Sequence, residues 1–317
     1  MRKPTFGREL VAGIAATLLF FFSVLFIPMF GFLVGVFTPL PTVLVLYRWG
    51  VPSGYWVPGL AAALGCLILV ALEMSLSVPY LLAMLGLGVM LGLGMRRRWS
   101  FEKTIGVPSL LVFGGGALTF LAFHSGTEAG LIGYLEQAVR ESIAVALKEY
   151  GVASGDTRAL AQSLQAVVPV MVRLLPGIAL SSALFASWLN VLATVRYIRV
   201  HQLTPPFWGE WTRWQAPEHL VWGVIASGFA LMVPFGPFKI VGLNVLMVLA
   251  TVYLFQGMAI IAFYMERKKV PRFLRAVIYG FILLQMVATA AAILVGLFDM
   301  WFDFRRLKPK PEKERDE

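Results

Sequence analysis

The chain alternates long apolar segments with short polar ones, and this pattern predicts a bundle of membrane-spanning helices. Apolar runs that approach or exceed the ~20 residues needed to cross a bilayer recur along most of its length. We expect helices over 8–27, 34–48, 53–73, 78–96, 104–124, 168–198, 219–234, 238–264 and 273–298. The predicted fold class is an all-α, polytopic transmembrane bundle of eight or nine spans.

Residues 125–167 interrupt this series with a more polar pattern. Apolar side chains recur there every three or four positions, as in an amphipathic helix: Ile132, Leu135, Val139, Ile143, Ala146 and Tyr150. Asp156 or Thr157 is suited to cap a second helix that runs through Leu164. We expect a helical insert on the surface of the bundle, which either caps the structure or covers a cavity as a lid.

Basic residues beside the apolar segments predict the orientation of the spans, because cytoplasmic loops are enriched in lysine and arginine. If the first five spans alternate, one side carries Arg2, Lys3, Arg8, Arg48, Arg96, Arg97, Arg98 and Lys103. We expect that side to be the cytoplasm, with residues 125–167 outside. Nine spans would export the basic tail, residues 303–317. Eight spans with both ends inside is the alternative, in which either 219–234 or 238–264 is re-entrant or interfacial, and the short segment 219–234 is the stronger candidate.

Composition agrees with a membrane protein and argues against other classes. The chain is 59% hydrophobic and 14% charged, whereas about 25% of the residues of a soluble domain are charged. The net charge is +10, and the basic residues that cause it lie beside the apolar spans. We therefore expect no nucleic-acid partner. The first apolar segment lacks a cleavage site and is expected to stay in the protein.

The glycine-rich stretch MLGLGVMLGLGMRRRWS, residues 84–100, raises the question of a phosphate-binding loop. The dinucleotide spacing G-x-G-x-x-G fails, because the third position after Gly86 and Gly88 is Leu91. Gly88 and Gly92 instead have the four-residue spacing that lets two helices approach closely in lipid. We expect a span whose glycine face packs on a neighbouring helix.

Residues 201–218 form a linker rich in tryptophan and proline, with Trp208, Trp211 and Trp214 followed by Trp222. Tryptophan favours the headgroup level of the membrane, which predicts an interfacial belt. An aromatic cage for a ligand is the alternative.

Catalytic motifs and cysteine-histidine metal spacings do not occur, so we expect neither an enzyme nor a cofactor. The best exception is Asp299 and Asp303, four positions apart and followed by Arg305 and Arg306. Such a pair suits a divalent cation and a lipid phosphate. The alternative is a polar helix end anchored by Trp301.

Polar groups inside spans suggest a substrate site, since they are costly there unless paired or used. Trp56, Glu73, Arg173 and Asn190 are candidates to line an outward-facing cavity between the third and sixth spans. The alternative places Glu73 and Arg173 among headgroups and lets Asn190 bond across helices.

Two stretches, NVLMVLATVYLFQGMAIIAFYMERKK at 244–269 and GLFDMWFDFRR at 296–306, together with the tryptophan-proline linker, resemble the YybS-like family of bacterial membrane proteins. That resemblance covers nearly the whole chain and implies no assigned activity.

Residues 8–200 also resemble the substrate-binding S component of energy-coupling-factor transporters. The similarity lies in six spans with both ends inside, Pro41 followed by YRWG, and the glycine-rich fourth span. Ala12 and Ala16 are similar to the A-x-x-x-A by which S components pack on their transmembrane partner.

The S-component resemblance implies solute binding or uptake at the bacterial inner membrane, with an energy-coupling subunit and ATPases as partners. The insert 125–167, the extension 219–298 and the charged tail 299–317 depart from the S-component pattern. The alternative function is a non-transporting scaffold for cell-envelope assembly proteins.

Overall fold

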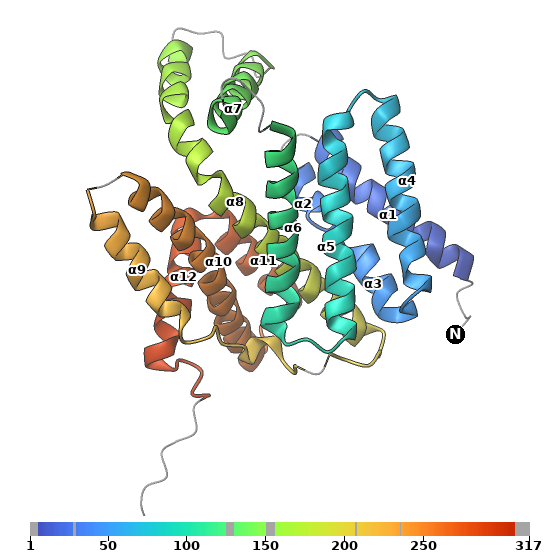
Figure 1. Ribbon diagram of the computed structural model, residues 1–317. Coiled ribbons are helices and arrows are strands. Elements are labelled where there is room, and N and C mark those ends of the chain that lie inside the picture. The colour runs from blue at the N-terminus through green and yellow to red at the C-terminus, as the bar shows by residue number, and fades with distance from the viewer. Residues whose placement is uncertain are drawn as a thin grey trace, which may run out of the picture. The chain divides into compact units, whose positions relative to one another are not determined.

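The computed structural model describes residues 6–27, 30–124, 130–149, 156–206, 208–234 and 236–307. The regular structure of these residues is helical, with no strand among them, which confirms the predicted all-α class. The chain divides into two compact units, unit 1 (Met1–Phe207) and unit 2 (Trp208–Glu317) (Figure 1). Arg2, Lys3, Tyr150 and the tail beyond Leu307, all used in the sequence predictions, lie outside the described residues.

Unit 1 begins with a bundle in which the early helices surround an apolar core. Its helices are α1 (Phe6–Phe26), α2 (Gly31–Gly35), α3 (Leu40–Trp49), α4 (Trp56–Ala71), α5 (Val78–Arg96), α6 (Phe101–His124), α7 (Gly130–Glu149) and α8 (Asp156–Val200). Short 3₁₀ turns at Ser53–Tyr55 and Ser75–Ser77 precede α4 and α5. The core cluster consists of Phe21, Ala61, Leu69, Leu81 and Leu85.

Glycines let α5 approach α3 closely. A Cβ at Gly88 would lie 2.8 Å from the carbonyl oxygen of Pro39, and one at Gly92 would lie 2.8 Å from the Cβ of Leu46. Gly86 points elsewhere, with nothing within 4 Å of its Cβ position. The backbones of α3 and α5 therefore meet along the face that carries Gly88 and Gly92.

Helix α1 packs on its neighbours through a different face from the one that carries both alanines. Gly13 and Thr17 are buried, and a Cβ at Gly13 would lie 3.1 Å from a methyl group of Val57 on α4. Ala12 is exposed and Ala16 is half-buried.

The second predicted span is broken. The expected helix over 34–48 is divided into α2 and α3 by a turn at residues 36–39. Pro39 and Pro41 have no N–H to donate to the carbonyls one turn earlier, which explains the break. Together the two pieces, Gly31–Trp49, still have the length and composition of a span.

Helix α8 is longer than predicted. The sequence indicated a short helix through Leu164 and a separate span from 168 to 198, but the structure has one helix of 45 residues, Asp156–Val200. At 1.5 Å per residue it is about 67 Å long, roughly twice the ~30 Å hydrocarbon core. Helix α7 packs beside its first half (Figure 1), and Arg140 of α7 donates to the side chain of Gln165 at 2.7 Å.

Unit 2 contains a short 3₁₀ turn, Trp211–Arg213, followed by α9 (Leu220–Met232), α10 (Gly236–Arg267), α11 (Arg272–Leu284) and α12 (Met286–Phe302). Helix α9 has only 13 residues, fewer than the predicted segment 219–234. Helix α10 packs on both α9 and α12.

Helices α10 and α12 run in the same direction. The two helices cross where Tyr253 and Gly257 meet Gly296 and Ala292. Beyond this crossing, Tyr264 of α10 bonds to Phe304, which follows α12. Because both segments reach this contact after the crossing, their carboxyl ends lie at the same end of unit 2. An antiparallel pair would place Phe304 far from Tyr264.

The last predicted span, 273–298, is wrong in shape. It consists of α11 and α12, which are bent by 98° at Gln285. Only residues 268–271 separate the end of α10 from α11, and α12 returns to that same end. The pair therefore enters and leaves on one side, as a re-entrant element does.

Seven stretches of the described residues are long and apolar enough to cross a membrane, or eight if α11 and α12 count as one span. Six of them lie in unit 1. The structure therefore agrees with eight spans as an upper number, and the predicted upper number of nine is one too many for the described residues.

Candidate functional site

The four residues predicted to line a cavity are spread over the length of two helices. Trp56 begins α4 and Glu73 follows its end, and the 17 positions between them correspond to about 26 Å along a helix. Arg173 and Asn190 are separated by the same number of positions on α8. Each pair therefore extends across most of the bilayer thickness.

Only Asn190 lies in the interior of unit 1. Trp56 is 58% exposed, and Glu73 and Arg173 are exposed as well. The main packing partners of α4 are α1 and α5, whereas those of α8 are α6 and α7. The structure thus separates Asn190 from the other three candidates.

Asn190 is held against the break between α2 and α3. Its Nδ2 donates to the carbonyl oxygen of Val36 at 2.8 Å and to that of Ala186 at 2.7 Å. The carbonyl of Val36 is available because the N–H of Leu40 bonds to Phe37 instead. The broken span therefore provides the partner of the asparagine.

The other end of the same amide has no partner. Because Nδ2 faces both carbonyls, the Oδ1 of Asn190 points away from them, and it is buried without a hydrogen bond. The hydroxyl of Thr42, in the first turns of α3, is likewise buried and unpaired. The hydroxyl of Ser181 on α8 is a third such group, so the described part of unit 1 buries three unpaired side-chain oxygens that can accept hydrogen bonds.

A stripe of small polar residues on α8 surrounds the asparagine. Ser187, Asn190 and Thr194 are fully buried and follow one another at intervals of three and four residues, so they share one face. Ser187 bonds to Ser109 of α6 at 2.8 Å, and Thr194 donates to the carbonyl of Asn190 at 2.7 Å. This interior is polar and uncharged.

The sequence analysis did not single out Thr42, Ser187 or Thr194. Two signals were present: Pro39 and Pro41 directly before Thr42 in an apolar run, and the helical spacing of Ser187, Asn190 and Thr194. The first marks a helix break and the second marks a polar face.

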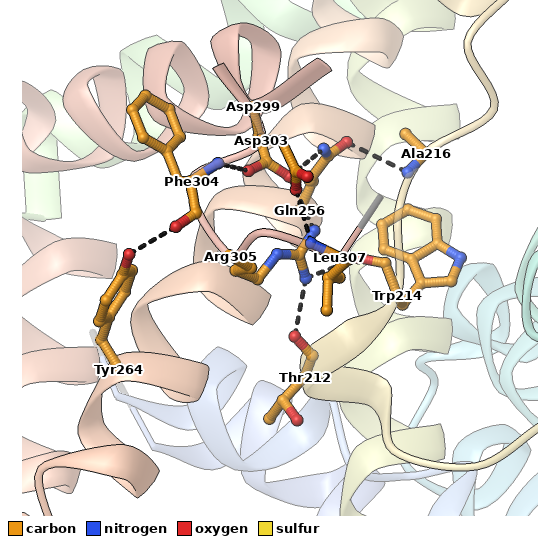
Figure 2. A network of polar contacts seen from close by, with 10 residues as sticks. All are labelled: Thr212, Trp214, Ala216, Gln256, Tyr264, Asp299, Asp303, Phe304, Arg305 and Leu307. Atoms are coloured by element: carbon orange, nitrogen blue, oxygen red, sulfur yellow. Dashed lines mark hydrogen bonds and ion pairs between the residues drawn. The ribbon is translucent and has the colours of Figure 1, made fainter. Parts of the chain in front are cut away.

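Unit 2 contains a second buried polar cluster, shown in Figure 2. Asp299 of α12 forms an ion pair with Arg305 at 2.8 Å, and both side chains are fully buried. The second oxygen of the carboxylate accepts from the N–H of Phe304 at 2.9 Å, and Gln256 of α10 donates to the first at 3.0 Å. Every oxygen of Asp299 is engaged.

The same cluster holds the tryptophan-rich linker. Arg305 donates to the carbonyls of Thr212 and Trp214 at 2.7 and 3.0 Å, and the N–H of Ala216 donates to Gln256 at 3.1 Å (Figure 2). Through these hydrogen bonds, Arg305 and Gln256 hold the linker against α10 and the end of α12. The buried Nε of Arg305 has no partner.

Asp299 and Asp303, the two carboxylates considered as metal ligands, make different contacts. Asp299 is paired with Arg305, while Asp303 has a left-handed backbone (φ 38°) that ends α12 and accepts the N–H of Leu307 at 2.9 Å. Among the described residues, no three of the side chains His, Cys, Asp and Glu gather as metal ligands would. The geometry favours a polar, anchored helix end.

The chain matches the family described as "Predicted membrane protein (DUF2232)" over residues 15–300, and it belongs to that family. No curated protein and no solved structure gives a significant match. The family match and the apolar helices agree that this is an integral membrane protein.

Proposed function

We propose that this DUF2232 member binds a small solute inside unit 1 and takes part in its uptake across the bacterial cytoplasmic membrane. The observation that carries the proposal is the unpaired, buried Oδ1 of Asn190 beside the break between α2 and α3. Broken helices often form binding sites in transporters, because they expose backbone groups at membrane depth.

The chemistry of this interior suggests the kind of solute. Two buried acceptors without partners, on Asn190 and Thr42, each destabilise the empty protein by about 1–3 kcal/mol. A guest that donates hydrogen bonds to them removes this penalty. The polar side chains of the α8 stripe are amides and hydroxyls, so we expect a solute with N–H or O–H donors and no net negative charge.

The S-component resemblance supplies the expected partners of the uptake reaction. It implies an energy-coupling membrane subunit with cytoplasmic ATPases. The six candidate spans of unit 1 and the exposed Ala12 on α1 support this proposal, because an exposed small residue allows a partner helix to approach.

A scaffold for cell-envelope assembly proteins is the second candidate function. It is favoured by the hairpin of α7 and α8, since α8 is far longer than a bilayer requires. The hairpin exposes apolar side chains, among them Ile132 at 54% and Val145 at 62%. Such a surface suits contacts with other proteins.

A metabolite screen by thermal shift on the purified protein tests solute binding. Thr42→Val removes one unpaired hydroxyl at nearly constant volume, and we expect it to weaken binding of the solute about tenfold, the value of one hydrogen bond. Thr17→Val is the matched control, because the Thr17 hydroxyl is already paired with Gly13 within α1. Asn190→Ala is expected to weaken binding at least as much.

Two results would contradict the proposal. One is a screen in which no solute raises the melting temperature, and the other is a solute whose affinity falls equally in the Thr17 control. Co-purification then separates the two candidate functions. ATPase subunits in the eluate support uptake, whereas envelope-assembly proteins support a scaffold.

A further inference from the structure

We propose that the turn between α10 and α11 in unit 2, together with Arg306, binds the phosphate headgroup of an anionic phospholipid. This site is independent of the solute site in unit 1. Its basic residues are Arg267, Lys268, Lys269, Arg272, Arg275 and Arg306.

Tertiary contacts bring these residues together from two parts of the chain. Five of them lie within nine positions at the end of α10 and the start of α11. Arg306 follows α12, and the hydrogen bond from Tyr264 to the carbonyl of Phe304, at 2.6 Å, holds that segment beside the end of α10. The re-entrant course of α11 and α12 thus adds a sixth cation to the turn.

The cations are free to meet an anion. Arg275 is half-buried and uses its Nε to bond the carbonyl of Val270 at 2.8 Å, and the other five side chains are exposed. None of the six forms an ion pair with an acid of the described residues. Six unneutralised charges at a helix end favour a phosphate group.

Helix α11 provides the apolar half of a lipid site. Phe273, Val277, Phe281 and Leu284 recur at intervals of four, four and three residues, so they share one face. Their exposed fractions are 81%, 49%, 61% and 76%. The buried Ile282 and the half-buried Arg275 lie on the opposite side.

This combination selects a lipid rather than a soluble anion. A helix with an exposed aromatic and aliphatic face and a basic end binds at the membrane interface, where acyl chains and headgroup are both within reach. A soluble phosphate would contact only the basic side chains and would leave the apolar face of α11 without a partner.

The test compares lipids and anions on the full-length protein purified in a neutral detergent. Phosphatidylglycerol, phosphatidylcholine, inorganic phosphate and glycerol phosphate are titrated separately. Bound lipid is counted by native mass spectrometry, and melting temperatures are recorded in parallel. We expect phosphatidylglycerol to bind and stabilise the wild type more strongly than the other three.

The diagnostic variant is Arg267→Gln with Arg272→Gln. Both side chains are exposed and make no hydrogen bond within the described residues, so folding in phosphatidylcholine is expected to be unchanged. Phosphatidylglycerol should bind roughly thirtyfold more weakly, from the loss of two interfacial charges. Arg267→Lys with Arg272→Lys should remain within a fewfold of the wild type.

The control variant, Arg196→Gln with Arg199→Gln, removes two exposed arginines from the end of α8 and should keep most of the affinity. Equal losses in both double variants would overturn the site, because general charge attraction would then explain binding. Equal binding of the two lipids would also overturn it. Inorganic phosphate that reproduces the stabilisation would reassign the site to a soluble anion and refute the lipid.

Discussion

The two units bury polar groups in opposite ways. The interior of unit 1 around Asn190 is uncharged and leaves oxygens without partners, whereas the interior of unit 2 contains an ion pair whose carboxylate is fully engaged. A carboxylate whose two oxygens are both paired fixes one arrangement of the chain, even though the Nε of Arg305 has no partner, while unpaired acceptors leave bonding capacity for a guest. The comparison therefore supports an anchoring role for the ion pair of unit 2 and agrees with the proposed solute binding in unit 1.

The largest expected effect is the loss of the ion pair in unit 2. Arg305→Met should destabilise the protein by about 3–5 kcal/mol, because it leaves the Asp299 carboxylate buried without its cation. Thermal unfolding in detergent measures this change. Adding Asp299→Asn should restore part of the stability, and a double variant as unstable as Arg305→Met alone would show that the charge is not the cause.

The next largest effect concerns helix contact in unit 1. Gly88→Leu should destabilise by about 1–3 kcal/mol, since its Cβ alone would lie 2.8 Å from a backbone carbonyl of the α2–α3 turn. Gly86→Leu is the matched control, with free space around its Cβ position. Similar melting temperatures for the two variants would mean that α3 and α5 do not depend on this contact.

Removing an unpaired oxygen from unit 1 should stabilise the empty protein. Thr42→Val is expected to raise stability by about 1–3 kcal/mol, because no hydrogen bond is lost and the cost of burying an unpaired hydroxyl is removed. The expected stability changes of Thr42→Val and Arg305→Met therefore differ in sign, and measuring both tests the comparison between the units directly. A loss as large as that of Arg305→Met would place Thr42 in an essential structural network.

The two charged candidates should matter less than the interior. Glu73→Gln and Arg173→Ala alter exposed groups of opposite charge, so we expect each to change the affinity of a charged solute by at most a fewfold at low salt and in opposite directions, with the effect fading as salt screens the charges. Binding titrations at two ionic strengths measure this. A loss beyond that of Thr42→Val would move the site toward Glu73 and Arg173.

Labelling experiments test topology without a stability change. In a Cys66→Ala background, Glu141→Cys should react with an impermeant thiol reagent from outside, whereas Arg97→Cys should not. Arg315→Cys should behave like Arg97→Cys, because α12 returns to the basic end of α10. External labelling at position 315 would contradict the arrangement in which α9 and α10 both cross and α11 and α12 return to the same side.

The sequence by itself determined the helical class and the approximate position of most spans, because long apolar runs have no other stable arrangement in lipid. Its glycine spacing also pointed to the face of α5 that meets α3. These inferences rest on local composition and spacing, which a sequence displays directly.

Only the tertiary structure decided where polar groups meet. Asn190 depends on a carbonyl 154 positions earlier, and Arg305 on carbonyls more than 90 positions earlier. The 98° bend at Gln285 and the continuity of α8 could not be predicted from the sequence either. Hydropathy reports how apolar a segment is and not the direction in which it runs. Partners and directions are set by packing between distant segments, and for that reason spacing along the chain could not reveal them.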